Sequence, residues 1–331
     1  MTTKQGPCRV LPNHLKRFFR SAVFALLRFA GLPFLIRELW QRRKVTVVVY
    51  HALPADLAEV HFRALRRRYN VIALSDFLAA RANRTTDQLP PKALIITFDD
   101  GHRSNYELKS LLEKQRIPVT IFLCSGIVGT QRHYWWFHTR NAAEAQALKT
   151  LPDEQRAQAL LEKGHADTTE YEARQSLSTA EIAEMKGLVD FQSHTVFHPI
   201  LPACSEQRAN REIVESKQAL ESQYGLKICA LAYPNGNYSN RELSLLRKAG
   251  YACGLTLDPG CNDSETDLLC LRRVALPDDA GINELIVKTS GLWIFLKAFG
   301  ANARRRSSRK PAPPDGGGLL PTVAPDGGSV H

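Results

Sequence analysis

The stretch ALIITFDDGHRSNYEL, residues 93–108, decides the fold of this chain. Its first six residues are apolar or β-branched and predict a buried strand, which gives way to Asp99, Asp100 and Gly101. The residues after Gly101 have the amphipathic period of a helix. A strand, a polar turn and a helix in succession are the repeating unit of parallel α/β folds, whose functional side chains follow the strands. The two adjacent carboxylates therefore mark a candidate site.

The same alternation recurs along the 331 residues and predicts a parallel α/β sheet or barrel. Four more apolar runs have the length of buried strands, at residues 45–50, 119–124, 188–193 and 228–233. Helical patterns lie between these runs. Two of the helices begin with capping boxes, Ser178 with Glu181 and Ser239 with Glu242, which predict where each helix starts.

Composition divides the chain into parts. We expect one α/β domain over residues 45–291, with a helical insertion at about 131–177, where a polar segment interrupts the rhythm of strands. The insertion contains the aromatic cluster YWWF at residues 134–137. Residues 301–331 have no periodicity and are rich in Pro, Gly and Arg, so we expect a disordered basic tail there.

The formal net charge of +11 belongs to the two ends of the chain. Residues 1–44 carry ten Lys or Arg against one Glu, and residues 301–331 carry five against two Asp, which leaves −1 for the residues between them. No basic surface interleaved with aromatic residues is predicted within the domain. We therefore expect no nucleic-acid partner.

The N-terminal segment, residues 1–44, is basic and amphipathic. Its apolar stretch at 22–36 is interrupted by Arg28, which makes it too short and too charged for a spanning helix and a poor signal peptide. Basic residues on both sides of aromatic and leucine-rich turns favour a helix that lies on an anionic membrane surface. The alternative is an amphipathic helix packed on the domain.

The seven cysteines are odd in number, scattered and free of any C-x-x-C pair. This pattern argues against a disulfide framework and against a structural zinc ribbon, and it favours a reducing compartment. We therefore expect a cytoplasmic protein, peripheral on the inner face of the membrane, with export as the alternative.

Several predicted strands are followed at their carboxyl ends by side chains that bind metals or transfer protons. These are His51, the pair Asp99 and Asp100, His194 with His198 four residues later, and the turn that follows Tyr233. Taken alone, each has an ordinary interpretation as a turn, a helix cap or a surface histidine. Taken together, two imidazoles and a carboxylate make a three-ligand site suited to Zn²⁺, with an open position for water.

Three segments, TFDDG, SHTVFHP and ALAYPNG, resemble the successive motifs of the polysaccharide deacetylases, that is, carbohydrate esterase family 4 or the NodB homology domain. The resemblance covers about residues 45–291 and implies an irregular (β/α) barrel. It also implies a metal-dependent hydrolase of non-peptide amide bonds, which removes N-acetyl groups from amino sugars of a glycan or glycan precursor.

The resemblance gives the two aspartates different roles. Asp100 would bind a divalent metal ion, most simply Zn²⁺, together with His194 and His198. Asp99 would be the general base that takes a proton from the attacking water. Adjacent residues at a strand end point in different directions, so one carboxylate can face the ion and the other the water.

The resemblance also suggests the acid and the oxyanion site. Members of the family that begin with a strand ending in Tyr-His would use that histidine, here His51, to protonate the leaving nitrogen. The turn with Tyr233 and Asn235 would stabilise the oxyanion or contact the substrate. His102, directly after the first motif, should instead face the start of the next helix.

Two features depart from the family pattern. The third motif lacks the Arg that usually precedes it, and we expect Arg273, or its neighbour Arg272, to reach Asp99 from another strand. The usual C-terminal catalytic histidine is absent as well, since the only histidine after His198 is His331.

The sequence leaves the substrate open. One alternative is a lipid-linked amino sugar that bears a formyl or acetyl group, and another is an inactive glycan-binding relative, against which the complete set of site residues argues. The aromatic cluster at 134–137 could stack on sugar faces or pack against the barrel.

Overall fold

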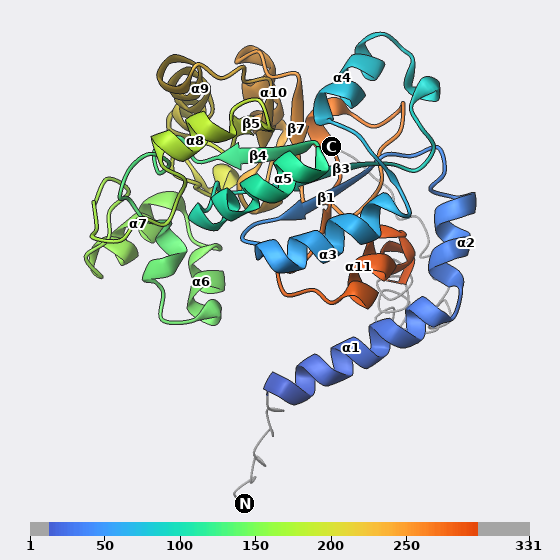
Figure 1. Ribbon diagram of the computed structural model, residues 1–331. Helices are drawn as coiled ribbons and strands as arrows, with labels where there is room; N and C mark the ends of the chain where they lie inside the picture. The colour runs from blue at the N-terminus through green and yellow to red at the C-terminus, as the bar shows by residue number, and fades with distance from the viewer. Residues whose placement is uncertain (1–12, 297–331) are drawn as a thin grey trace, which may run out of the picture. The chain divides into compact units, whose positions relative to one another are not determined.

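The computed structural model of the chain describes residues 13–296, and the tail expected at 301–331 lies outside them. Within these residues eight strands form one parallel sheet in the order β7-β6-β5-β4-β3-β1-β8, with β2 beside β3 (Figure 1). The strands are β1 Thr46–Tyr50, β2 Asn70–Val71, β3 Ala93–Phe98, β4 Val119–Leu123, β5 Val189–Ser193, β6 Ala230–Ala232, β7 Cys253–Leu255 and β8 Val274–Ala275.

The described residues contain eleven α-helices, most of which connect successive strands from β1 to β7. They are α1 Asn13–Phe29, α2 Leu32–Leu39, α3 Ala55–Arg66, α4 Leu74–Ala82, α5 Lys109–Gln115, α6 Ala142–Leu148, α7 Asp153–Leu161, α8 Thr179–Met185, α9 Glu206–Tyr224, α10 Asn240–Lys248 and α11 Ile282–Thr289. Both predicted capping boxes are confirmed, at the first turns of α8 and α10.

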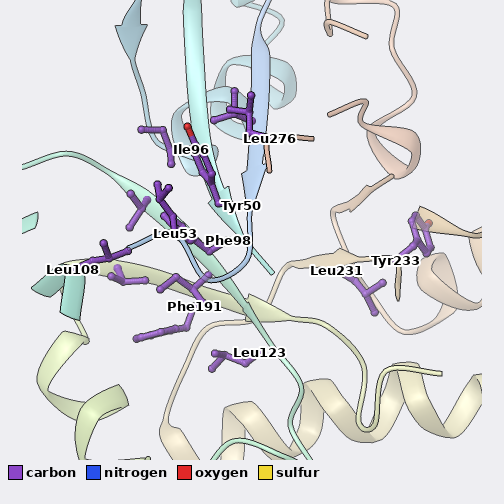
Figure 2. Packing of buried hydrophobic residues seen from close by; sticks show 14 of the residues in the cluster. Tyr50, Leu53, Ile96, Phe98, Leu108, Leu123, Phe191, Leu231, Tyr233 and Leu276 are labelled. Carbon is purple, nitrogen blue, oxygen red and sulfur yellow. The ribbon is translucent and has the colours of Figure 1, made fainter. Parts of the chain in front are cut away.

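Alternate residues of the central strands face two separate hydrophobic clusters. Tyr50, Ile96 and Phe98 belong to the larger one, which Figure 2 shows and which includes the buried faces of the surrounding helices. Val47 of β1 lies in the second cluster together with Leu255 of β7. Since β1 and β7 are far apart in the strand order, their side chains meet only because the sheet curls around a common interior.

The curled sheet is an irregular, incompletely closed (β/α) barrel. Its edges approach each other where Leu255 of β7 forms an isolated parallel bridge with Leu271, in the segment that enters β8. The next residue, Thr256, donates its backbone N–H to the Leu271 carbonyl at 2.8 Å. The open rim at the carboxyl ends of the strands is where the sequence predicts the site.

The segment at 131–177 contains a 3₁₀ turn, Trp135–His138, followed by α6 and α7. It is attached to the barrel through polar contacts. The Trp135 indole Nε1 donates to the His198 carbonyl at 3.2 Å, and the Asp167 carboxylate pairs with Arg208 of α9 at 2.5 Å. The insertion therefore contacts the backbone of the second motif directly.

The N-terminal helix α1 packs on α11 through one of its faces. Phe24 is buried against this helix, Arg20 pairs with Glu284 at 2.6 Å, and Arg28 donates to the Asn283 side chain at 2.7 Å. The sequence left open whether this segment lies on a membrane or packs on the domain, and one face of α1 does pack on the domain.

Candidate active site

The backbone of the strands brings the predicted residues to one rim of the barrel. Asp99 donates its backbone N–H to the Tyr50 carbonyl at 2.9 Å, so the end of β3 lies beside the end of β1 and its successor His51. His194 donates its N–H to the Leu123 carbonyl at 2.8 Å, which extends the ladder from β4 to β5. Parallel pairing thus places the strand ends side by side.

Asp100, His194 and His198 converge in three dimensions. One ligand atom from each lies within 4.8 Å of the others, and all three residues are buried. The Asp100 Oδ1 atom is 3.4 Å from His194 Nε2 and 3.6 Å from His198 Nε2. These are the three residues that the sequence analysis assigned to a metal ion, and their donor set of one carboxylate and two imidazoles is one that Zn²⁺ prefers.

The backbone at this site adopts a conformation that few residues other than glycine accept. Asp100 has φ 73°, Thr195 has 68°, His198 has 57° and Asn235 has 55°. Left-handed backbone at a non-glycine residue costs about 1–3 kcal/mol and persists where the surrounding structure requires it. Its concentration at these positions shows that the fold fixes the direction of the side chains at an energetic cost.

The hydrogen bonds prepare His194 to act as a metal ligand. Its Nδ1 lies 2.7 Å from the Ala232 carbonyl oxygen, which can only accept, so Nδ1 carries the proton. Nε2 is then the atom that faces Asp100, and although burial lowers the pKa of His194, the charges of Asp99 and Asp100 outweigh burial and raise it. Burial and the neighbouring His194 lower the pKa of His198 to about 3, so the His198 imidazole is neutral at physiological pH.

Asp100 is ionised and incompletely satisfied. Burial by itself would raise the pKa of Asp100, but the hydrogen bond to His102 and the nearby imidazoles of His194 and His198 hold it well below the ordinary value. Its Oδ1 atom is buried and has no hydrogen-bond partner among the described residues. An unpaired buried carboxylate oxygen is costly, and a cation between it and the two imidazoles would remove that cost. The residues present therefore fit a divalent metal ion.

The second carboxylate, Asp99, lies on the interior side of the rim and forms a bidentate ion pair. Arg273 Nη1 and Nη2 donate to its two oxygens at 2.7 and 2.8 Å. Arg273 is only 1% exposed and also donates through Nε to the Thr256 carbonyl. Burial would raise the pKa of Asp99, but the charge and hydrogen bonds of Arg273, together with the nearby His194 and His51, outweigh burial and lower it. Of the two arginines named from the sequence, Arg273 makes this contact, and the side chain of Arg272 is exposed.

His51 is held by contacts that the sequence analysis did not anticipate. Asp278 accepts the backbone N–H of His51 and of Ala52, both at 3.0 Å, and the Asn105 amide donates to the His51 carbonyl at 2.8 Å. The imidazole is partly exposed and close enough to both aspartates to lower their pKa. No local sequence pattern links residue 51 to residue 278, so only the folded chain shows this support.

Two expectations from the sequence are wrong in detail. His102 does not face the next helix, since its Nε2 lies 3.1 Å from Asp100 Oδ2, behind the candidate metal site. The side chain of Tyr233 does not face the site either. It is fully buried, and its hydroxyl donates to the Leu269 carbonyl at 3.0 Å. Tyr233 therefore supports the core beneath the turn, and of that pair Asn235 remains at the rim.

The aromatic cluster at 134–137 packs against the site. The Tyr134 hydroxyl donates to the Asp100 carbonyl at 2.9 Å, and the Trp135 indole binds the His198 carbonyl. The Trp136 ring lies 4.6 Å from the His198 ring, edge to face. Phe137 alone is exposed, at 55%. Of the two interpretations that the sequence allowed, packing describes the first three of these residues.

Lys149 is a site residue that the sequence analysis missed. It follows α6 in the insertion, and its ammonium group donates to the Asn235 side-chain oxygen at 2.8 Å. Burial lowers the pKa of Lys149, and the negative charge of Asp100 partly offsets that effect. A single lysine in a polar segment has no distinguishing pattern, so this contact could not be foreseen.

Comparison with known proteins gives a consistent result. A family model described as polysaccharide deacetylase matches residues 86–254, which are 169 of the 331 residues. The chain is 24% identical over 242 residues to YxkH of Bacillus subtilis, a protein assigned to the polysaccharide deacetylases, and covers 71% of its length. It is 26% identical over 202 residues to the poly-β-1,6-N-acetyl-D-glucosamine N-deacetylase of Staphylococcus epidermidis. That match takes in 58% of this chain and 57% of the staphylococcal enzyme.

Solved structures share the fold. The Streptococcus pyogenes deacetylase PplD, in complex with acetate, matches with a TM-score of 0.56 at 21% identity, over 74% of this chain and 98% of that one. IcaB from Ammonifex degensii also matches with a TM-score of 0.56 at 21% identity, over 75% and 97% of the two chains. The irregular (β/α) barrel predicted from the sequence is confirmed.

Proposed function

Because the chain belongs to the polysaccharide deacetylase family, we propose that it hydrolyses the amide bond of N-acetylated amino sugars in a glycan and releases acetate. One observation carries the proposal. The buried Oδ1 atom of Asp100 has no hydrogen-bond partner among the described residues, yet it faces the imidazole nitrogens of His194 and His198. Such a set of donors suits a divalent metal ion, and Zn²⁺ is our candidate.

The metal would supply activation of water and of the amide. A divalent ion held by Asp100, His194 and His198 would lower the pKa of a coordinated water towards about 7 and polarise the acetyl carbonyl. The chain's own residues would then move the protons. Asp99, ionised and oriented by Arg273, accepts the proton of the attacking water.

Two further groups complete the proposed chemistry. An amine anion is a poor leaving group at neutral pH, so an acid must protonate the departing nitrogen, and His51 at the end of β1 is suited to that role. The backbone N–H of Asn235, in the turn after β6, would donate to the developing oxyanion. Lys149 holds the side chain of Asn235 and would keep this turn in place.

We propose a β-1,6-linked N-acetylglucosamine polymer as the first substrate to test, since the staphylococcal relative is named for its action on that polymer. The lipid-linked amino sugar and the inactive glycan-binding relative remain the rival functions. Incubation of the metal-loaded protein with N-acetylated oligosaccharides of defined linkage, and separately with a lipid-linked N-acylated amino sugar, followed by mass spectrometry, separates the three. Loss of one acetyl mass per site supports deacetylation. Binding without any mass change on all glycans tested would favour the inactive relative.

A further inference from the structure

The N-terminal helices present an apolar surface that the catalytic site does not use. No single helix among residues 13–296 has the length and hydropathy to span a membrane. The bent pair Arg17–Phe29 and Leu32–Leu39, with 58° between its helices, reaches that hydropathy when the two are taken together. These helices precede the barrel. The face of α1 that contacts α11 carries arginines, and this leaves the apolar face exposed.

Helix α1 divides into two faces of opposite character. With 3.6 residues per turn, Arg17, Arg20, Phe24, Leu27 and Arg28 share the face towards α11, and the arginines there bind acidic or amide side chains of that region. Over residues 17–29 the opposite face carries only exposed apolar residues, which are Phe18, Phe19, Ala22, Val23, Leu26 and Phe29, and Ala30 directly after the helix is exposed as well. The usual arrangement of an amphipathic helix on a soluble domain is thereby reversed, with arginines inward and large apolar side chains outward.

Helix α2 continues the apolar surface. Leu32, Leu35 and Leu39 are 43%, 50% and 79% exposed, and they lie three and four residues apart on one side of the helix. Phe34 is 58% exposed beside them. Together with α1, this makes an exposed apolar patch over two consecutive helices, which monomeric soluble domains seldom keep without a function.

Arginines border this patch. The Arg28 guanidinium lies 5.2 Å from the centre of the Phe29 ring, and the Arg37 guanidinium lies 5.4 Å from the centre of the Phe34 ring. Arg68, after α3, is close to both cations, since burial and the like charges of Arg28 and Arg37 lower its pKa. Only Arg37 has a carboxylate partner here, Glu38 at 2.7 Å. Arg67, next to Arg68 in the sequence, is exposed and forms no ion pair within residues 13–296. The rim of the patch therefore carries positive charge that α11 does not neutralise.

We propose that α1 and α2 form a docking surface for an anionic lipid bilayer, with the apolar patch inserted at the level of the acyl chains and the arginine rim among the phosphates. An apolar face with cationic borders matches the profile of a bilayer interface, where insertion and headgroup attraction act together. A second copy of the chain would bring the same arginine rim against itself, and like charges oppose that pairing. This inference does not depend on the proposed deacetylation.

The test is flotation of the full chain with vesicles of phosphatidylcholine, with and without phosphatidylglycerol. The native chain should float with the mixed vesicles. Leu26→Asp combined with Phe29→Asp should reduce the bound fraction about tenfold or more, because two large apolar side chains no longer insert. Leu161→Asp is the matched control, since Leu161 of α7 is 57% exposed and lies outside the patch. It should float like the native chain.

The cationic rim is tested separately. Arg67→Gln should weaken binding to the anionic vesicles about fivefold at low salt and leave the melting temperature unchanged. Arg211→Gln, on α9, serves as the control. Equal flotation of the native chain and the Leu26/Phe29 variant would overturn the proposal. So would a fall in native molar mass on that substitution without any vesicle binding, which would assign the patch to self-association.

Discussion

The strand ends of the barrel and the insertion at 131–177 contribute to one site in different ways. The strands supply the groups to which chemistry is assigned, Asp99 and Asp100 after β3 and His194 after β5. The insertion supplies contacts to those groups, through Tyr134 on the Asp100 carbonyl and Lys149 on Asn235. In this molecule the barrel supplies the candidate reacting groups, and the insertion supplies hydrogen bonds to them.

The largest effects on activity should come from substituting the two aspartates one at a time. Asp100→Ala should abolish both metal content and activity, because two imidazoles alone make a weak site. Asp99→Asn should keep the metal and lower kcat by about 10²- to 10⁴-fold, the usual worth of a positioned base. Metal analysis after gel filtration, alongside acetate release, distinguishes the two. If the Asp99→Asn variant lacked metal and the Asp100→Ala variant retained it, Asp99 would be the metal ligand and Asp100 the base.

Substitutions of His51 and His102 should likewise have different effects, one on turnover and the other on metal affinity. His51→Ala should retain metal and lose about 10²- to 10⁴-fold in kcat if this side chain protonates the leaving nitrogen. His102→Ala should instead weaken metal affinity by about 10- to 100-fold, because His102 orients a carboxylate of the site from behind. Titration with a chelator measures the second effect. A normal kcat in His51→Ala would move the acid role to another group.

The Arg273–Asp99 pair should matter for both stability and catalysis. Arg273→Met leaves a buried carboxylate without its partner, which costs about 3–5 kcal/mol of unfolding free energy. The second substitution Asp99→Leu in the same chain should recover most of that stability without recovering activity. Thermal melting gives the stability, and Arg272→Gln, at an exposed neighbour, is the control. A melting temperature that stays unchanged in Arg273→Met would contradict the buried pair.

A smaller effect is expected from the insertion. Lys149→Met removes a charge-assisted hydrogen bond to Asn235 and should lower kcat/KM by about 3- to 10-fold with metal content unchanged. Lys149→Arg should restore part of the activity, whereas a purely steric role would give no such rescue. Lys163→Met, also in the insertion but paired with Glu144, should have normal kinetics. Equal losses in both methionine variants would mean that the insertion acts through its overall stability.

The smallest expected effect is a pH dependence confined to the insertion. Burial, with the neighbouring His138 and His133, lowers the pKa of His165 to about 4, so the fold favours its neutral form. The stability that this provides is complete above the unfolded pKa and is lost as pH falls through it towards the folded value. Limited proteolysis at about pH 5 should therefore cleave the native insertion faster than at neutral pH. His165→Gln should reduce that difference, and the remainder comes from His138, whose pKa is also lowered by burial.

Much of the barrel could be predicted because its signals are local. Buried strands of five or six residues appear as apolar runs, and the capping boxes at Ser178 and Ser239 involve residues three apart. The spacing of His194 and His198 needs no knowledge of the fold either. The strands β2 and β7 were not predicted, since segments of two and three residues are too short for a periodic pattern.

The sequence by itself determined which residue types follow each predicted strand along the chain. It also determined the family, because both are properties of short segments. Only the tertiary structure decided which arginine meets Asp99, 174 residues away, and that Lys149 meets Asn235 across 86 residues. Such contacts depend on how far the sheet curls and where the insertion settles against the rim. Both are set by the packing of the whole core, and no local pattern encodes that packing.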